Sequence, residues 1–416
     1  MSWAKETKNY SERERLITFI LNELETKKKE KAFKDAFMEA SIKLEEEEEE
    51  TLTEIRKGEF FKKVLENLQY FVSHSLEYND NIYCFKDKTS DMINRIHPEV
   101  KLKLTDTKAD INFALGLSID LYARNSKYNS QEMNFDFGLK RRLGHYNLNI
   151  QNEIVKNYVA PMELGVNQEI FPTYWMEHFL FAFGRRFNRL MIGGDYSFRY
   201  YDYESGYSYE RDRISNEWGI NLEYRIAPKT YFFSQVRYGL SNYVYDSSRD
   251  SDYKEFNFGL RGLLTHKLTG TLGFGYRYQN YKSAPDFKSA TLSWDLNYNF
   301  SQFTNFSFGF KRTTEESGYA NQNYYVGNSF RLGVLHRLAF NPRISIGLNT
   351  DFSYRDYPKT EAIKREDDLW SMGLGIGYQM RKWLEFGFNY SYQMRTSNVE
   401  YDYNNNVFTF TTTATF

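Results

Sequence analysis

The sequence predicts an all-β fold: a closed antiparallel transmembrane β-barrel of about eighteen strands, preceded by a short α-helical segment. Three observations predict it. Apolar and polar side chains alternate over most of the chain, short turns alternate with longer loops, and aromatic residues are abundant in a hydrophilic sequence. The 416 residues include 35 Tyr and 35 Phe, yet the mean hydropathy is −0.68. A membrane barrel combines these properties because only alternate residues of each strand face lipid.

The composition excludes several other classes of protein. No apolar stretch approaches the length of about 18 residues that a membrane-spanning helix needs. Only helices and closed sheets satisfy their backbone groups in lipid, so a membrane protein with this sequence has to be a barrel. The net charge of −1 argues against a nucleic-acid partner. The single cysteine, Cys84, excludes a disulfide within the chain.

A period of two runs from about residue 68 to the end of the chain. In residues 271–279, Leu272, Phe274 and Tyr276 alternate with Gly273 and Arg277 and with other small or polar residues. Successive side chains of a strand point to opposite faces, so each such stretch has one apolar and one polar face. The expected strands are about 12–18 residues long, which exceeds the usual five or six of globular sheets. The same alternation is seen in residues 290–300, 343–355, 371–380 and 383–394.

Two kinds of connection alternate between these strands. Short turns are expected at 105–108, 142–145, 185–189, 227–229, 265–270, 300–303, 340–343 and 380–383. Longer polar loops are expected at 79–91, 124–130, 156–168, 202–212, 246–252, 282–286, 314–322, 356–367 and 395–402. Such asymmetry is typical of bacterial outer-membrane barrels, whose short turns are periplasmic. Both ends of the barrel are therefore expected in the periplasm.

Residues 1–66 differ from the rest and are expected to form a charged, α-helical periplasmic segment, with the barrel in 67–416. Apolar residues repeat there at helical spacing, namely Leu16, Phe19, Ile20, Leu24, Phe33, Phe37 and Ala40. The run Glu45–Glu50 is interpreted as a solvated helical face, with cation binding as the alternative. The segment is expected to plug or gate the periplasmic mouth, or to recruit a periplasmic partner. No secretory signal is visible at residue 1, so we expect the numbering to begin after a leader or at a misassigned start.

The last strand is expected to carry an assembly signal. Phe408, Phe410 and Phe416 share one face with Thr412 and Ala414. A terminal Phe on the lipid face resembles the signal that outer-membrane barrels present to the barrel-assembly machinery. The expected partners are therefore this machinery and outer-membrane lipid.

One segment carries a family resemblance. Residues 76–104 resemble the opening of the beta-barrel porin 2 family, and the family's extent fits a barrel from about 68 to 416. The resemblance implies an outer-membrane barrel without catalytic residues or a cofactor. Similar barrels occur in exopolysaccharide and capsule gene clusters, which implies export of polysaccharide together with a periplasmic export partner. The residues that carry it are Tyr78, Asn79, Asp80, Asn81, Ile82, Ser90, Asp91, Ile93, Arg95, Ile96 and Pro98.

The polar face of the strands is expected to line the lumen, which stays open in barrels of 16–18 strands unless something plugs it. The expected basic residues are Arg199, Arg225, Arg237, Arg261, Arg277, Lys311, Arg331, Arg337, Arg343, Arg355 and Arg395. The expected acidic residues are Asp195, Glu223, Asp295, Asp351 and Glu385. One interpretation is a basic lumen that favours anionic or hydroxyl-rich solutes. The other is that these cations pair with carboxylates across neighbouring strands.

The sequence does not favour an enzyme. No two of the six histidines are closely spaced, no serine motif stands near them, and no strong metal-ligand spacing is present. The tyrosines in 200–209 and 241–246 are expected either to stack on sugar rings or to form the interfacial aromatic girdle of the barrel. The predicted function is a porin-like channel for passage or export of polar or anionic solutes. The alternative is a surface adhesin or outer-membrane anchor with a blocked lumen.

Overall fold

The computed structural model describes residues 57–158, 172–204, 211–283, 286–317, 324–357, 364–399 and 402–416. The chain divides into two units, Met1–Glu66 and Asn67–Phe416. In the first unit the structure describes helix α3 (Lys57–Glu66). The helices expected at 16–40 and the run Glu45–Glu50 lie outside the described residues. Within the described ranges, no helix is both long and apolar enough to cross a bilayer.

The described residues of the second unit form eighteen strands and two short 3-10 helices. The first nine strands are β1 (Leu68–Asn79), β2 (Asp91–Thr105), β3 (Ala109–Tyr122), β4 (Ser130–Leu143), β5 (Tyr146–Tyr158), β6 (Thr173–Phe187), β7 (Leu190–Tyr203), β8 (Arg213–Ala227) and β9 (Thr230–Tyr243). The others are β10 (Ser251–Leu263), β11 (Leu268–Tyr281), β12 (Phe287–Asn299), β13 (Thr304–Glu316), β14 (Tyr324–Leu338), β15 (Asn341–Asp356), β16 (Glu366–Arg381), β17 (Leu384–Ser397) and β18 (Tyr403–Thr415). The 3-10 helices are η1 (Ser126–Tyr128) and η2 (Ser247–Arg249).

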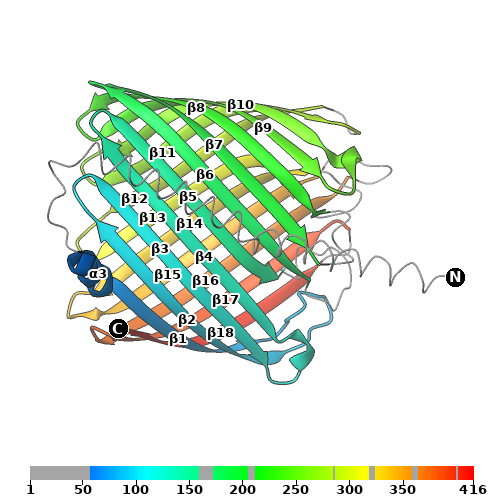
Figure 1. Ribbon diagram of the computed structural model, residues 1–416. Helices are drawn as coiled ribbons and strands as arrows, with labels where there is room; N and C mark the ends of the chain where they lie inside the picture. The colour runs from blue at the N-terminus through cyan, green and yellow to red at the C-terminus, as the bar shows by residue number, and fades with distance from the viewer. Residues whose placement is uncertain are drawn as a thin grey trace, which may run out of the picture. The chain divides into compact units, whose positions relative to one another are not determined.

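The strands form one closed antiparallel sheet. Each strand pairs with its neighbours in sequence, and β1 also pairs with β18, from Phe71↔Thr415 to Asn79↔Val407. The strands run obliquely around the barrel (Figure 1), as closure of a sheet requires. The prediction of a closed eighteen-stranded antiparallel barrel is confirmed.

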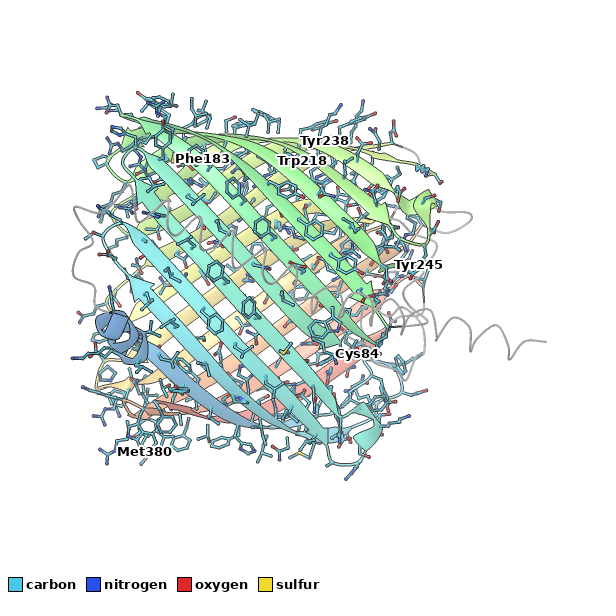
Figure 2. All side chains as sticks on the ribbon, in the orientation of Figure 1. Cys84, Phe183, Trp218, Tyr238, Tyr245 and Met380 are labelled. Carbon is cyan, nitrogen blue, oxygen red and sulfur yellow. The ribbon has the colours of Figure 1, made fainter. Side chains whose placement is uncertain are left out.

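The alternation in the sequence separates two faces of this sheet. Phe183, Trp218 and Tyr238 are exposed and labelled in Figure 2. In the register Tyr238 lies beside Trp218, and these two rings stack with their centroids 6.0 Å apart. We call the face with the exposed aromatic residues the outer face and the opposite one the inner face. A barrel with its aromatic side outward matches a lipid surface, because the surrounding hydrocarbon is apolar.

The two ends of the barrel differ in their connections. Several strands meet through only two residues at the end that we call the short-turn end. Gly144 between β4 and β5 has a φ of 61°, and Asn188 between β6 and β7 has a φ of 54°. Glycine and asparagine adopt such positive φ values most readily, which explains these residues in the turns. The opposite end, with the loops that join β1 to β2, β3 to β4 and so on, is the long-loop end.

The first long loop joins the beginning of the barrel to its end. Asn81 is fully buried, and its side-chain amide donates to the backbone carbonyls of Phe85 (2.7 Å) and Asn404 (2.9 Å). The carboxylate of Asp80 accepts hydrogen bonds from the backbone N–H and side-chain amide of Asn406, at 2.6 and 2.8 Å. Burial by itself raises the pKa of Asp80, but the hydrogen bonds from Asn406 and Lys88 outweigh it and hold the pKa below its usual value. Asp80 and Asn81, which are among the residues that carry the family resemblance, therefore fasten the end of β1 to β18.

Candidate functional site

The basic and acidic side chains expected to line the lumen lie on the inner face. Arg237, for example, stands between the exposed Val236 and Tyr238, and is paired in the register with Gly219 and Glu255. The same alternation places the other expected residues on this face. They are Arg199, Arg225, Arg261, Arg277, Lys311, Arg331, Arg337, Arg343, Arg355 and Arg395, with Asp195, Glu223, Asp295, Asp351 and Glu385.

The inner face also carries acids that the sequence analysis did not include. Glu217 stands next to the exposed Trp218, and Glu255 next to the exposed Phe256, so both carboxylates point to the inner side. Glu217 shares β8 with Arg225, and Glu255 shares β10 with Arg261, and both arginines were expected on this face. The same period of two therefore predicts both carboxylates from the sequence. Further acids on this face include Glu77, Glu99, Asp110, Asp120, Glu132, Asp136, Glu153, Glu315 and Asp367, and further bases there include Arg95, Lys140, Arg142 and Arg213. Acids and bases on the inner face are consequently more nearly balanced than expected.

Cross-strand ion pairs tie these charges together. Arg277 Nε donates to Glu255 Oε2 at 2.6 Å, and the Arg277 guanidinium lies 4.0 Å from the ring centroid of Tyr253. The carboxylate of Glu217 accepts hydrogen bonds from Arg237 and from the Tyr253 hydroxyl. The two pairs thus form one network across β8–β11. Such pairing removes much of the net charge that the arginines would otherwise present to a solute.

Four more of the expected bases have an acidic partner. Arg331 is 2.7 Å from Asp351, and Lys311 is 3.2 Å from Glu315. Arg261 pairs with Glu223, and Arg395 lies 2.6 Å from Asp367. In the part of the chain that the structure describes, Arg199, Arg225, Arg337 and Arg343 form no ion pair. Five of the eleven expected basic residues thus pair with a carboxylate on another strand, and Lys311 pairs with one on its own strand β13.

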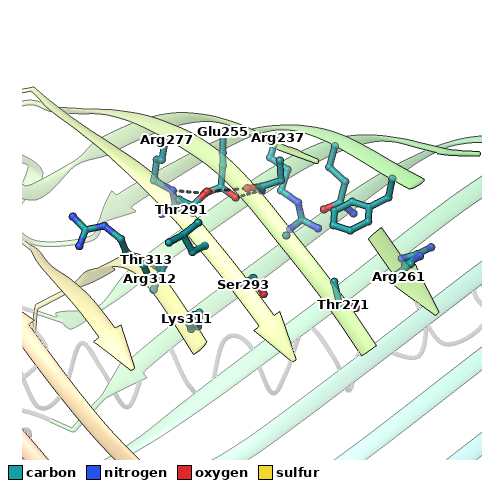
Figure 3. A pocket seen from close by; sticks show the side chains of 15 residues that line it. Arg237, Glu255, Arg261, Thr271, Arg277, Thr291, Ser293, Lys311, Arg312 and Thr313 are labelled. Atoms are coloured by element: carbon teal, nitrogen blue, oxygen red, sulfur yellow. Dashed lines mark hydrogen bonds and ion pairs between the residues drawn. The ribbon is translucent and has the colours of Figure 1, made fainter. Parts of the chain in front are cut away.

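A cavity of about 300 Å³ lies against the charged network (Figure 3). It is lined by strands β9–β13, and hydroxyl groups stand among its charged groups. The labelled residues of its wall are Arg237, Glu255, Arg261, Thr271, Arg277, Thr291, Ser293, Lys311, Arg312 and Thr313. This arrangement offers a polar solute both charge and neutral hydrogen-bonding partners.

Another part of the wall carries small polar residues instead. A cavity of about 390 Å³ lies against β13–β17, and Asn305, Asn349, Asn389, Ser307 and Ser391 contribute polar groups to it. Glycines 333, 347, 373 and 375 also line this cavity. Because glycine and serine occupy little volume, this side of the wall leaves room for water and solute. The wall therefore carries a charged network at β8–β11, and β13–β17 present a neutral polar surface where they line the second cavity.

At the long-loop end a second charged cluster is fully enclosed. Asp367 has no exposed surface, and its carboxylate contacts Arg365 at 2.9 Å and Arg395 at 2.6 Å. The hydroxyl of Ser397 donates to the same carboxylate at 2.6 Å. A buried carboxylate with two guanidinium partners is strongly held, since each partner left alone would be an uncompensated charge.

The last residues of β13 and the first residues of β14 lie on the lumen side of the barrel wall. The ladder between β12 and β13 stops at Leu292↔Arg312, although β12 begins at Phe287 and β13 continues to Glu316. Glu316 instead accepts hydrogen bonds from Tyr243 on β9 (3.2 Å) and Gln279 on β11 (3.3 Å). The ring of Tyr324 stacks on Tyr281, with centroids 4.9 Å apart. The β13–β14 hairpin end thus covers the inner face of β11–β12 and narrows the long-loop end.

The tyrosines near residue 200 divide between the two faces. Tyr201 and Tyr203 lie on the inner face, where the guanidinium of Arg213 is 4.0 Å from the Tyr201 centroid and that of Arg211 is 5.7 Å from the Tyr203 centroid. These two rings are therefore not part of an outer girdle. Residues 205–210 lie outside the described residues. Tyr245, in the next long loop, is exposed (Figure 2).

One histidine has a serine partner that the spacing of the sequence did not reveal. His178 Nε2 on β6 lies 3.1 Å from Ser197 Oγ on β7, and Glu153 Oε2 on β5 lies 3.8 Å from His178 Nδ1. The second distance exceeds the reach of a hydrogen bond, and Ser197 is only 3% exposed. This geometry does not reach that of a nucleophilic triad. Among the described residues, no group of His, Cys, Asp or Glu is suited to holding a metal ion.

The carboxyl-terminal residues complete the wall. Phe408, Phe410 and Phe416 lie on the outer face and are exposed. The backbone of Phe416 exchanges two hydrogen bonds with Tyr70 of β1, at 2.8 and 3.0 Å, and its ring stacks near Trp383. The expected assembly signal is thus a lipid-facing row beside the seam where the barrel closes.

Replacing Asp367 with Asn should lower the free energy of unfolding by about 3 kcal/mol, because Arg365 and Arg395 lose a buried charged partner. The matched control is Asp351→Asn, whose Arg331 partner is 70% exposed and which should cost less than about 1 kcal/mol. Urea unfolding in detergent micelles, monitored by tryptophan fluorescence, measures the free energy of unfolding of both variants. Equal losses for the two variants would contradict the assignment of Asp367 as a buried charge centre.

The thiol of Cys84 should be poorly reactive in the folded protein. Burial raises its pKa to about 12, and the opposing effects of Arg395 and Tyr403 are smaller. The thiol therefore stays protonated up to strongly alkaline pH, and only the thiolate is alkylated. At pH 8.5 iodoacetamide should react about tenfold or more slowly than with an exposed control thiol, Ser247→Cys in a Cys84→Ser background. If Cys84 and the control thiol were alkylated at similar rates in the folded protein, the shielding of the Cys84 thiol would be refuted.

Comparison with known proteins agrees with this geometry. The family model described as "Putative beta-barrel porin 2" matches residues 69–416. No curated protein matches the chain. Similar solved structures are outer-membrane proteins of Pseudomonas aeruginosa. OpdK with vanillate is 10% identical over 84% of this chain and 99% of that chain, with a TM-score of 0.48.

Two more of these structures have similar values. OccK11 (OpdR) is 13% identical over 84% of this chain and 97% of that chain, with a TM-score of 0.44. OprD is 11% identical over 84% of this chain and 95% of that chain, with a TM-score of 0.43. The match of the family model covers almost all of the barrel. The chain therefore belongs to the Putative beta-barrel porin 2 family and is a porin-like channel of the bacterial outer membrane.

Proposed function

We propose that this channel passes small polar solutes by diffusion, with a modest preference for anions, and that its short-turn end faces the periplasm. The observation that carries the proposal is the inner face, whose charges are mostly paired and whose other residues are small and polar. Paired charges leave only a weak net field, so solutes of either sign can enter. Arg199, Arg225, Arg337 and Arg343 have no acidic partner among the described residues and favour anions.

A hydroxyl-rich solute fits this wall as well. Threonine and serine hydroxyls line the cavity of Figure 3, and asparagine amides line the cavity at β13–β17. These groups both donate and accept hydrogen bonds, as sugar hydroxyls do. Export of polysaccharide with a periplasmic partner is the narrower form of this proposal. It rests on the family resemblance, and slowed ion flow upon addition of a neutral oligosaccharide would support it.

In planar bilayers with a KCl gradient, the purified full chain should conduct, with a reversal potential between zero and the chloride Nernst potential. A reversal potential on the potassium side would contradict the anion preference. A barrel that never conducts would instead favour the adhesin or anchor. The hairpin end of β13–β14, which narrows the long-loop end, is the feature that favours this second function.

Paired variants of the network in Figure 3 sharpen this measurement. Glu255→Gln leaves Arg277 without its carboxylate and should move the reversal potential toward chloride. Arg277→Gln leaves Glu255 alone and should move it toward potassium. Opposite shifts of similar size would place the network beside the ion path. Absence of any shift in both variants would remove these residues from the path.

We also propose that Phe408, Phe410 and Phe416 are recognised by the barrel-assembly machinery. Their exposed rings and the backbone bonds of Phe416 to Tyr70 support this role. Phe416→Ala should reduce the amount of folded barrel in the outer membrane severalfold without changing the unfolding of barrel that is refolded in detergent. The control is Phe340→Ala, since Phe340 is also a highly exposed ring and lies in a turn away from the terminus. Equal reduction by both variants would refute the proposal.

A further inference from the structure

A third, larger cavity lies at the short-turn end. Its volume is about 1090 Å³, and it extends along the ends of strands β3 to β10. It is bounded by the β2–β3 and β4–β5 turns, which contribute Lys108 and His145. It is therefore distinct from the cavity of Figure 3, with which it shares only Arg261.

The wall of this cavity carries several cations. Lys108, Lys140, Arg142 and Arg186 line it, and within the described ranges none of the four forms an ion pair. Three carboxylates also line it, those of Asp106, Asp110 and Glu223.

Two of these carboxylates have other partners. The Asp106 carboxylate accepts a hydrogen bond from the backbone N–H of Thr107 at 2.6 Å, and Glu223 pairs with Arg261. Asp110 lies opposite Lys140 in the register, but the two form no ion pair. The cavity therefore keeps an excess of cations whose charge is available to a ligand.

The strand register explains why these cations converge. Lys140 and Arg142 are two residues apart on β4, so both point to the inner face. Arg186 lies at the end of β6, where its backbone N–H donates to the carbonyl of His145 at 2.8 Å. The turn at Gly144 and His145 thus holds the ends of β4 and β6 on either side of β5. Asn147 on β5, opposite Arg142 in the register, adds a neutral amide to the cavity wall.

The chemistry and the size of the cavity point to one class of ligand. Guanidinium groups bind phosphate and carboxylate oxygens in a bidentate way, and a concave basic wall concentrates anions. A single phosphate would use only part of a space of about 1090 Å³. We propose that the short-turn cavity binds a molecule with several phosphate or carboxylate groups, and so collects polyanions at one mouth of the proposed channel. This deepens the proposed function and rests on it for the step from binding to passage.

Calorimetric titration of the full chain in neutral detergent tests the site. Tripolyphosphate and a trimer of galacturonate are the two probes, and their relative affinities separate phosphate from carboxylate recognition. We expect saturable binding of at least one probe. Arg142→Gln with Arg186→Gln should weaken that binding about tenfold or more, because both guanidinium groups leave the cavity. Absence of saturable binding of either probe to the unchanged chain would overturn the proposal.

The control variant removes the same charge at the same end of the barrel. Arg381→Gln with Lys382→Gln changes two exposed cations at the β16–β17 turn, which do not line the cavity. The affinity of this control variant for the probe should stay within about twofold of that of the unchanged chain. Equal weakening by both double variants would overturn the site, because it would show a general effect of charge. Circular dichroism of each variant confirms that the barrel is folded before titration.

Conductance separates this inference from the proposed function. Tripolyphosphate added at the short-turn side should reduce the current more than the same concentration added at the long-loop side. A barrel that conducts but binds neither probe overturns the polyanion site alone. A barrel that binds a probe but never conducts overturns the channel and leaves the site in place.

Discussion

Hydrogen bonding of the backbone across β1 and β18 is the constraint on which the rest of this structure depends. In hydrocarbon an unpaired strand edge is too costly to persist, so a sheet in lipid has to close on itself. Tyr70 and Phe416 exchange two backbone hydrogen bonds at one end of the seam. At its other end, Asp80 and Asn81 bind Asn406 and Asn404. Two of the residues that carry the family resemblance, Asp80 and Asn81, thus contribute directly to closure.

Closure in turn decides what the inner face can carry. Because every second residue faces lipid, the polar side chains of the other residues have to bind one another across neighbouring strands or remain hydrated. On β8–β11 they do so through ion pairs such as Arg277–Glu255. On β16 the inner-face glycines Gly373, Gly375 and Gly377 instead make room for the side chains of Asn349, Asn389 and Ser345 on the neighbouring strands. Charge is therefore a property of particular sectors of the wall and of its short-turn mouth.

The sequence predicted the number of strands and the closed antiparallel sheet, since these follow from a local period of two and from the alternation of short turns with longer loops. It also contained the signal for Glu217 and Glu255, which share the alternation of the acids that were expected. Contacts over long sequence distances were not predictable in this way. The pairing of Tyr253 with Glu217 depends on the register of three strands. The inward course of β13 was hidden because its alternation continues unchanged through Thr313 and Glu315.

The interrupted ladder between β12 and β13 has a mechanical consequence. A barrel is rigid because each strand is held along both edges, but beyond Arg312 the hairpin of β13 and β14 is held on one side only. Its remaining attachment to the opposite side consists of side-chain contacts such as those of Glu316 and Tyr324. The width of this mouth is consequently set by the side-chain contacts of one hairpin, whereas the backbone ladder sets the width of the rest of the cylinder.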